Sequence, residues 1–333
     1  MGMAPIRYAY DDAGAPVLSD VTDCLYQILK ACLVDGYGGK SAAGWSVVYD
    51  DWSGSGVFTI TNALQTFVLG LKKFSGSIYG PGIFICEAMI NASTPVNARS
   101  GRYYLSSLDD LTEAGEFQRG QFYNLPNAGQ FVMYANDNAF HLFSGPTGDL
   151  FNSHNTDGDD ICFWGSGAMF NAQGLADGDL GNGAVWVGNY RRYQSSSPGY
   201  TVMTDYSSNW HGTQFYSDGS AALSETWMQL QPFSQSTYNA TINISGSRYL
   251  PLAPAMALSR SDNADIGIVP GLYSCPQIVS YQQSIARSVL RQYFDTSLQT
   301  LKDTIELGGK TFTACNLGWD IYGMISLEPE DWL

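Results

Sequence analysis

The sequence has few charged residues, and the basic ones are the scarcest. Only 14% of the 333 residues are Asp, Glu, Lys or Arg, and 16 basic against 31 acidic residues give a formal net charge of −15. A surface that binds nucleic acid needs clustered Lys and Arg side chains to neutralise phosphates, so we expect no nucleic-acid partner. Anionic membrane surfaces are disfavoured for the same reason.

Long hydrophobic runs and paired cysteines are also lacking. No stretch reaches the roughly 18 consecutive apolar residues of a membrane-spanning helix, so we expect no membrane insertion. Residues 1–8 hold no apolar signal-peptide segment, which predicts a soluble protein made in a cytoplasm. No two cysteines have CxxC spacing, so we expect buried thiols that behave as small hydrophobic groups. These cysteines are Cys24, Cys32, Cys86, Cys162, Cys275 and Cys315.

Catalytic motifs are missing as well. The histidines are His141, His154 and His211, and none stands in an HExxH motif or a close pair, so zinc is not expected. His141 lies in an alternating segment and is expected to be half-exposed on a strand, whereas the other two lie in polar loops. There is no Gly-x-Ser-x-Gly elbow. A Cys–His pair, or the two carboxylates of a glycosidase, stays open because such partners need only be close in space.

Glycine and aromatic residues are abundant: the chain has 36 Gly, 21 Tyr, 16 Phe and 8 Trp. This composition excludes disorder as the main state and is typical of short strands joined by tight turns. We therefore expect a mainly β (α+β) fold, with antiparallel sheets in a β-sandwich-like body. An N-terminal amphipathic helix should pack on a sheet, and a second helix is expected in the C-terminal region.

The expected helices and strands follow from local patterns. Apolar residues recur at helical spacing from Val21 to Leu33, with Ser19 placed to cap the helix and Gly36 to end it. Residues 282–302 are the second expected helix, stopped by the glycines at 308 and 309. Asn136 and Asn138 flank a predicted hairpin turn, and residues 166–183 are expected to form a loop. Strands are predicted at 44–50, 56–62, 78–88, 99–106, 130–135, 139–144, 161–165, 184–193, 224–234, 237–245, 248–258, 311–316 and 321–327.

The chain is expected to divide into three parts. Residues 1–193 form an expected N-terminal α+β domain, and residues 194–220 an irregular connecting or interaction loop. Residues 221–333 form a C-terminal β-rich part, and whether it is continuous with the first domain stays open.

Two glycine-rich patterns resemble ligand loops without completing the motif. Residues 36–41 end in the Gly-Lys-Ser of a phosphate loop, but Val34 stands where that loop needs glycine, and the segment follows a helix instead of a strand. We interpret it as a glycine-rich helix exit. The acidic loops at 157–160 and 177–179 could hold calcium, but Trp164 occupies the position of the closing bidentate Glu. Solvated turns are the favoured interpretation, and no cofactor or metal is expected.

One region could form an interaction surface. Six aromatic residues crowd a loop-rich segment, where they would suit binding of a glycan or a protein partner. Ordinary packing in the β core is the favoured alternative. The six residues are Tyr190, Tyr193, Tyr200, Tyr206, Trp210 and Tyr216.

Several segments together resemble a known family. Residues 32–45, with the sequence CLVDGYGGKSAAGW, are called the signature segment below. This segment is similar to the N-terminal signature of a family of tailed-bacteriophage virion structural proteins. Further similar segments follow in the expected order along most of the chain: 7–16, 100–105, 134–143, 157–160, 270–273 and 308–311. The chain departs from the family at 194–220 and at 282–302, which we expect to carry particle-specific contacts.

The resemblance implies a virion structural role without established chemistry and supplies no catalytic residues. We expect a non-enzymatic protein made in the host cytoplasm, with other virion proteins and copies of itself as partners. The resemblance does not fix its place on the particle, but the net charge of −15 favours the virion exterior, away from packaged DNA. A minor capsid or head-decoration role is favoured, because fibres usually show repeats or coiled-coil stalks and none is visible. A tail or baseplate component that binds a receptor or a host-surface glycan is the first alternative, and a glycan depolymerase is the second.

Overall fold

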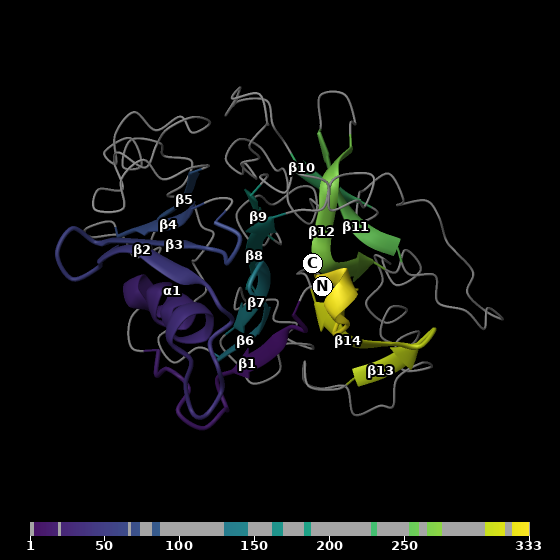
Figure 1. Cartoon of the computed structure of the whole chain (residues 1–333), viewed down its shortest axis with the longest axis horizontal. Coiled ribbons are helices and arrows are strands. Elements are labelled where there is room, and N and C mark those ends of the chain that lie inside the picture. The colour runs from purple at the N-terminus through teal and green to yellow at the C-terminus, as the bar shows by residue number, and fades with distance from the viewer. Residues whose placement is uncertain are drawn as a thin grey trace, which may run out of the picture.

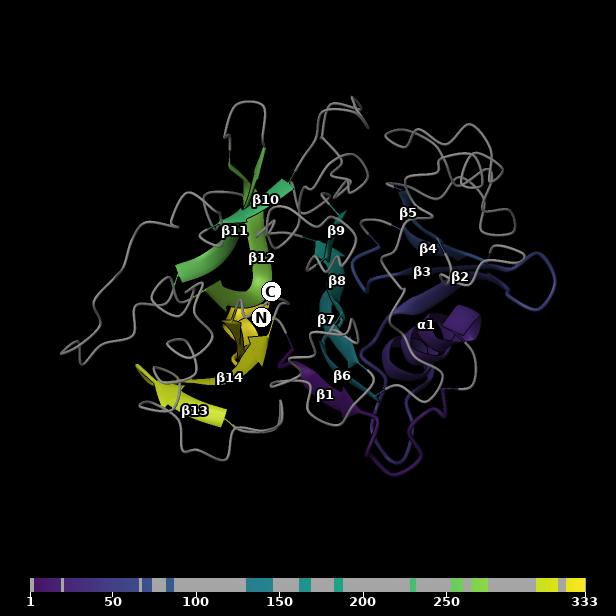
Figure 2. The ribbon, with the colours of Figure 1, turned by 180° about the vertical axis from the view of Figure 1, so that it is seen from behind.

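The computed structural model shows a mainly β fold, as predicted, and the described residues form three antiparallel sheets and one short α-helix (Figure 1). The sheets are called here the N-terminal, central and C-terminal sheets. In views from the front and from behind, the central sheet lies between the other two (Figure 2). The structure describes residues 3–18, 21–65, 68–73, 82–86, 130–145, 162–168, 183–187, 228–231, 253–259, 265–274, 304–316 and 322–332.

The central sheet joins the start of the chain to its middle. Its strand order is β1-β6-β7-β8-β9, and β1 pairs with β6 so that Arg7 lies opposite Tyr134. Strands β6 and β7 form the predicted hairpin, with Tyr134 opposite His141. The strands are β1 (Ile6–Ala9), β6 (Gln130–Ala135), β7 (Ala139–Gly145), β8 (Cys162–Ala168) and β9 (Gly183–Val187).

The N-terminal sheet is a meander in which each strand pairs with the next along the chain, in the order β2-β3-β4-β5. All five residues of β3 are buried. The edge strand β2 is largely exposed and has a register shift between Val47 and Tyr49, a feature that discourages edge-to-edge pairing. The strands are β2 (Ser46–Asp51), β3 (Val57–Thr61), β4 (Val68–Lys72) and β5 (Gly82–Cys86).

The C-terminal sheet has six strands in the order β10-β11-β12-β15-β14-β13. All described residues of the other two sheets precede residue 188, and all those of this sheet follow residue 227. The three-part domain division remains a prediction, and residues 194–220 lie outside the described chain. The strands are β10 (Met228–Gln231), β11 (Ala253–Ser259), β12 (Asp265–Ser274), β13 (Thr304–Leu307), β14 (Lys310–Asn316) and β15 (Tyr322–Ser326).

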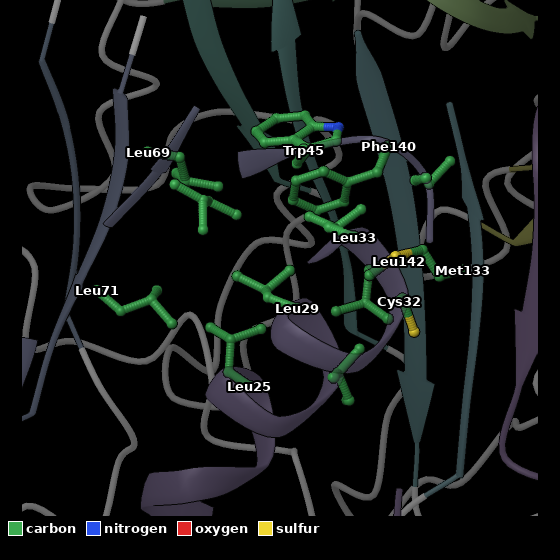
Figure 3. Packing of buried hydrophobic residues seen from close by; sticks show 14 of the residues in the cluster. Leu25, Leu29, Cys32, Leu33, Trp45, Leu69, Leu71, Met133, Phe140 and Leu142 are labelled. Carbon is green, nitrogen blue, oxygen red and sulfur yellow. The ribbon is translucent and has the colours of Figure 1, made fainter. Parts of the chain in front are cut away.

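Helix α1 (Val21–Leu29) continues into a π-helical segment, η1 (Lys30–Asp35), and Gly36 ends it as predicted. Its apolar stripe is buried between two sheets (Figure 3). Leu25 and Leu29 lie toward the N-terminal sheet, while Cys32 and Leu33 lie toward β6 and β7. A fully buried side chain of this size contributes about 1.5–3 kcal/mol, so this core ties α1 to both sheets.

Several predicted boundaries were wrong. Strand β8 runs to Ala168, into the predicted loop at 166–183. The Ala168 carbonyl accepts a hydrogen bond from Asn138 in the hairpin turn at residues 136–138. Strands β4, β12 and β13 were not predicted. Gly308 and Gly309 form the turn of the β13–β14 hairpin, so they are not the stop of a helix at that point. The expected helix at 282–302 lies outside the described residues, as do the strands expected at 99–106 and 237–245.

Candidate functional site

The signature segment packs against the first strand of the central sheet. It begins in η1 and reverses direction at residues 37–40, where Tyr37 and Lys40 pair through their backbones. This turn lies against residues 12–14, and the backbones approach so closely that a Cβ on Gly38 would overlap the Ala13 carbonyl oxygen. Gly38 also has a φ of +57°, a conformation that favours glycine. Glycine at this position therefore permits the contact.

Three side chains fasten the two segments, and we call Asp12, Tyr37 and Lys40 the clasp. The Lys40 ammonium lies 2.5 Å from Asp12 Oδ2 and donates to the Arg7 carbonyl oxygen at 2.8 Å. The Tyr37 hydroxyl lies 3.0 Å from the same carboxylate oxygen and accepts the Ala9 amide hydrogen at 3.0 Å. The clasp thereby covers the outer edge of β1 with side chains.

Burial and hydrogen bonds in and beside the clasp shift the pKa values of its groups. Burial alone would raise the pKa of Asp12, but hydrogen bonds from Lys40, the Ala9 amide and Tyr37 hold that pKa below its usual value. Burial, aided by the nearby Cys32 and Asp12, raises the pKa of Tyr37 far above its usual range. Burial likewise raises the pKa of the Cys32 thiol well above normal, so this cysteine lacks the thiolate character of a nucleophile.

This geometry confirms the helix-exit interpretation of residues 36–41. Gly36 is the C-terminal cap of η1, and its amide donates to the Ala31 carbonyl. A phosphate loop would instead present its lysine to a bound phosphate, whereas the Lys40 ammonium is engaged by Asp12 and the Arg7 carbonyl. The segment serves to attach β1.

The predicted hairpin turn at residues 136–138, called the central turn below, is the second cluster of polar groups. Asn136 is fully buried, and its Oδ1 accepts the backbone amides of Asn138 and Ala139, both at 2.9 Å. Its Nδ2 donates to the Met3 carbonyl at 3.2 Å, and its own carbonyl accepts Trp45 Nε1 at 2.9 Å. One asparagine thus links the segment before β1, the signature segment and the β6–β7 hairpin.

The central turn also contacts the N-terminal sheet and β8. Asn62, which follows β3, donates from Nδ2 to Asn138 Oδ1 at 3.0 Å, and Asn138 donates to the Ala168 carbonyl at 3.2 Å. The Ala63 amide donates to the Asp137 carbonyl at 2.8 Å. A buried amide network of this kind fixes one relative arrangement of the elements, because each unmade bond would leave a buried polar group unsatisfied.

His141 lies elsewhere than expected. The predicted half-exposed position is wrong, because the C-terminal sheet covers that face of β7 and the side chain is fully buried. His141 Nε2 donates to the Pro270 carbonyl at 2.6 Å, and its ring meets the indole of Trp332 edge to face, with centroids 5.1 Å apart. It bridges the central and C-terminal sheets.

The expected aromatic interaction surface lies outside the described residues. This holds for Tyr190, Tyr193, Tyr200, Tyr206, Trp210 and Tyr216. The acidic loops at 157–160 and 177–179, together with His154 and His211, also fall there. The predicted burial of cysteines as reduced thiols is confirmed for Cys24, Cys32 and Cys315.

Over the described ranges, no three His, Cys, Asp or Glu side chains come together as a metal site. The helix that the structure describes is too short to cross a bilayer.

Asp12 is the clasp residue that the sequence did not single out. A pattern could have indicated it: basic residues are so scarce that a lysine among small residues needs an acidic partner, and residues 11 and 12 form an acidic turn shortly before α1. The partners of Asn136 had no such local pattern, because Met3 and Trp45 are far away in sequence.

No protein-family model matches the chain, and a search of curated proteins found no match. The clasp, the central turn and the sequence of the signature segment are therefore the observations that bear on function.

Proposed function

We propose that this chain is a non-enzymatic structural protein of a tailed-bacteriophage virion. The observation that carries the proposal is the use that the fold makes of the signature segment. Cys32, Leu33 and Trp45 enter the core, while Tyr37 and Lys40 fasten β1. These five residues therefore hold the fold together, which supports a structural role.

The clasp chemistry supports the same role. Asp12 and Lys40 neutralise each other within a partly buried cluster, and Tyr37 is held by two backbone contacts of Ala9. Groups held in this way stabilise a rigid surface, which an assembly protein needs in many copies. They are poorly suited to exchange protons with a substrate, because the pKa of Asp12 is lowered and that of Tyr37 is raised.

We place the protein on the particle exterior, as a minor capsid or head-decoration subunit. A net charge of −15 disfavours contact with packaged DNA and keeps unassembled copies apart in solution. The abundance of tyrosine and tryptophan suits large subunit interfaces. The partners would be other virion proteins and further copies of this chain.

The test is to locate the chain in purified particles of the phage that encodes it. Particles are banded on a density gradient, treated with nuclease and analysed by quantitative mass spectrometry, with abundant host proteins as the contamination control. We expect the chain at a fixed ratio to the major capsid protein, and gold-labelled antibodies on the outside of intact heads. A chain that stays in the soluble lysate would overturn the virion role.

A tail or baseplate location is the second candidate, supported by the six aromatic residues between 190 and 216. Antibody label on tails would favour it over head decoration. The variants Trp210→Ala and Tyr216→Ala should then reduce host adsorption, while Tyr26→Ala, an aromatic change on α1, should not. Unchanged adsorption in the first two variants would remove the receptor- or glycan-binding role.

A further inference from the structure

The junction between the central and C-terminal sheets contains a buried histidine. His141 of β7 is fully buried and donates to the carbonyl of Pro270 on β12. Beside it, Tyr134 of β6 hydrogen-bonds the Thr313 side chain of β14. We call this junction, where β6 and β7 face β12 and β14, the seam. Arg7 of β1, which pairs with β6, also interacts with Tyr134, so a cation lies on the same side of the central sheet as the imidazole.

The last described residues close the seam, and we call residues 327–332 the latch. Trp332 is fully buried, with its ring against His141 and its Nε1 donating to the Ser326 carbonyl at 2.6 Å. The carboxylate of Asp331 accepts hydrogen bonds from Tyr273, Lys310 and Ser326 at 2.8, 2.6 and 2.5 Å. These contacts hold the latch to the C-terminal sheet.

The latch also reaches the central sheet. The Trp332 carbonyl lies 3.5 Å from the side-chain amides of both Asn136 and Asn138. Gly271, beside Pro270, makes room for the indole, since a Cβ there would lie 2.3 Å from the ring. One tryptophan therefore fills the seam next to His141 and touches both sheets.

The buried environment of His141 favours the neutral imidazole over the protonated one. Transfer of an ionised group into an apolar interior is costly unless an opposite charge or several acceptors compensate it. Burial lowers the pKa of His141 to about 4, and the Pro270 carbonyl, which favours the protonated ring, offsets this only in part.

Among the described residues, the three carboxylates of the latch already have other partners: Glu328 accepts the Thr311 amide, while Glu330 and Asp331 contact Lys310. The carboxylate nearest in the chain to Trp332 is Asp331, and it is already engaged by Lys310. The titratable or charged groups on the described elements around His141 lie on β1, β6, β12, β14 and the latch. They are Arg7 and Tyr8 on β1, Tyr134 on β6, Tyr273 on β12, Lys310 and Cys315 on β14, and Glu328, Glu330 and Asp331 in the latch.

We propose that the seam opens locally in mild acid, with His141 taking up the proton and the latch leaving its slot. In neutral solution the imidazole, the Pro270 carbonyl and the Trp332 ring close the seam. In acid the open form is favoured, because a protonated ring is solvated there. The core around α1 stays closed, since it lies on the other face of the central sheet. This opening of the seam does not depend on the proposed location of the protein in a virion.

Cysteine labelling can distinguish local opening from unfolding. Cys315 of β14 is fully buried and interacts electrostatically with Tyr134 at the seam. Cys24 and Cys32 are fully buried in the other core, between the N-terminal and central sheets. A seam that opens alone exposes the first thiol and leaves the other two protected.

The full chain is treated with a dithiodipyridine, a reagent that modifies thiols even in mild acid, and labelled positions are mapped by peptide mass spectrometry. Rates are divided by those of a small model thiol at each pH. Between pH 7 and pH 5 we expect labelling of Cys315 to accelerate by about 20-fold, the increase in open population that proton uptake by such a histidine provides. Labelling of Cys24 and Cys32 should not change.

Two variants test the assignment. His141→Gln keeps an amide that can donate to Pro270 but does not titrate, so its Cys315 labelling should be independent of pH. Trp332→Leu empties the slot and should expose Cys315 already at pH 7, which keeps the test informative if the first variant fails to fold. A wild-type Cys315 rate that does not change with pH would overturn the proposal. Equal acceleration at all three cysteines, or a pH response that persists in His141→Gln, would overturn it as well.

Discussion

At the scale of single residues, the scarce basic side chains are used as fasteners. Within the described chain the ion pairs involve Arg7, Lys30, Lys40, Lys73 and Lys310. Their exposure differs: the Lys40–Asp12 pair is partly buried in the clasp, whereas the Asp35 partner of Lys30 is half-exposed on the surface. Their contributions to stability should differ accordingly, because surface ion pairs contribute little.

Replacing Lys40 with methionine tests the clasp. Lys40→Met leaves Asp12 with an unmatched charge and the Arg7 carbonyl without its donor, so the free energy of unfolding should fall by about 1–2 kcal/mol. Lys30→Met is the matched control and should change it by less than about 0.5 kcal/mol. Urea-induced unfolding at pH 7 measures both. Equal losses would contradict a special role for the clasp.

The clasp also has a defined dependence on pH. The folded-state pKa of Asp12 is lowered, so its contribution is complete above the usual carboxyl range and is lost as the pH falls through that range. The difference in the free energy of unfolding between the wild type and Lys40→Met should therefore become smaller in strong acid.

At the scale of elements, local patterns predicted the parts that depend on near neighbours in sequence. The amphipathic stripe of α1, its end at Gly36 and the hairpin turn at Asn136 were all confirmed. The pattern that indicates each of them lies within a few neighbouring residues, so the sequence alone was enough to predict them.

Strand β12 shows why other elements were missed. It contains Pro270 and Gly271 in its middle, and both residues ordinarily indicate a turn. Here the proline supplies a carbonyl to His141 and the glycine makes room for Trp332, so the strand tolerates them because of contacts made far away in sequence. The same holds for Asp12 in the clasp, whose partners only the folded chain brings together.

Gly271 offers a prediction at this scale. Gly271 and Gly309 have similar positive φ angles of 65° and 82°, but only the former faces a neighbour, the indole of Trp332. Gly309→Ala should lower stability by about 1–2 kcal/mol, the usual conformational penalty. Gly271→Ala adds an overlap with the ring and should cost about 1–3 kcal/mol more. Thermal unfolding followed by circular dichroism checks the difference, and equal shifts would contradict the tight slot.

At the scale of the whole molecule, the central sheet is shared by two cores. Its β6 and β7 pack against α1 on one face and against the C-terminal sheet on the other. A buried titratable group between layers then makes global stability depend on pH.

The sign of that dependence follows from His141. Its folded-state pKa, about 4, lies below the ordinary value of 6.5, so its contribution is complete above pH 6.5 and is lost progressively as the pH falls toward 4. Between pH 7 and pH 4.5 the wild type should lose about 2 kcal/mol more than His141→Gln, which does not titrate there. Guanidinium unfolding at several pH values measures this. Parallel losses in the two proteins would contradict it.

The central turn has a further consequence, for the order in which the chain can fold. Asn136 needs Met3 and Trp45 from the first part of the chain and Trp332 from the last. During synthesis β1 emerges long before its partner β6, and the turn lacks its final contact until residue 332 has been made. Contacts between such distant segments slow folding. A nascent chain should therefore hold a preformed helix and hairpins for some time, and close them around Asn136 only after residue 332 has been synthesised.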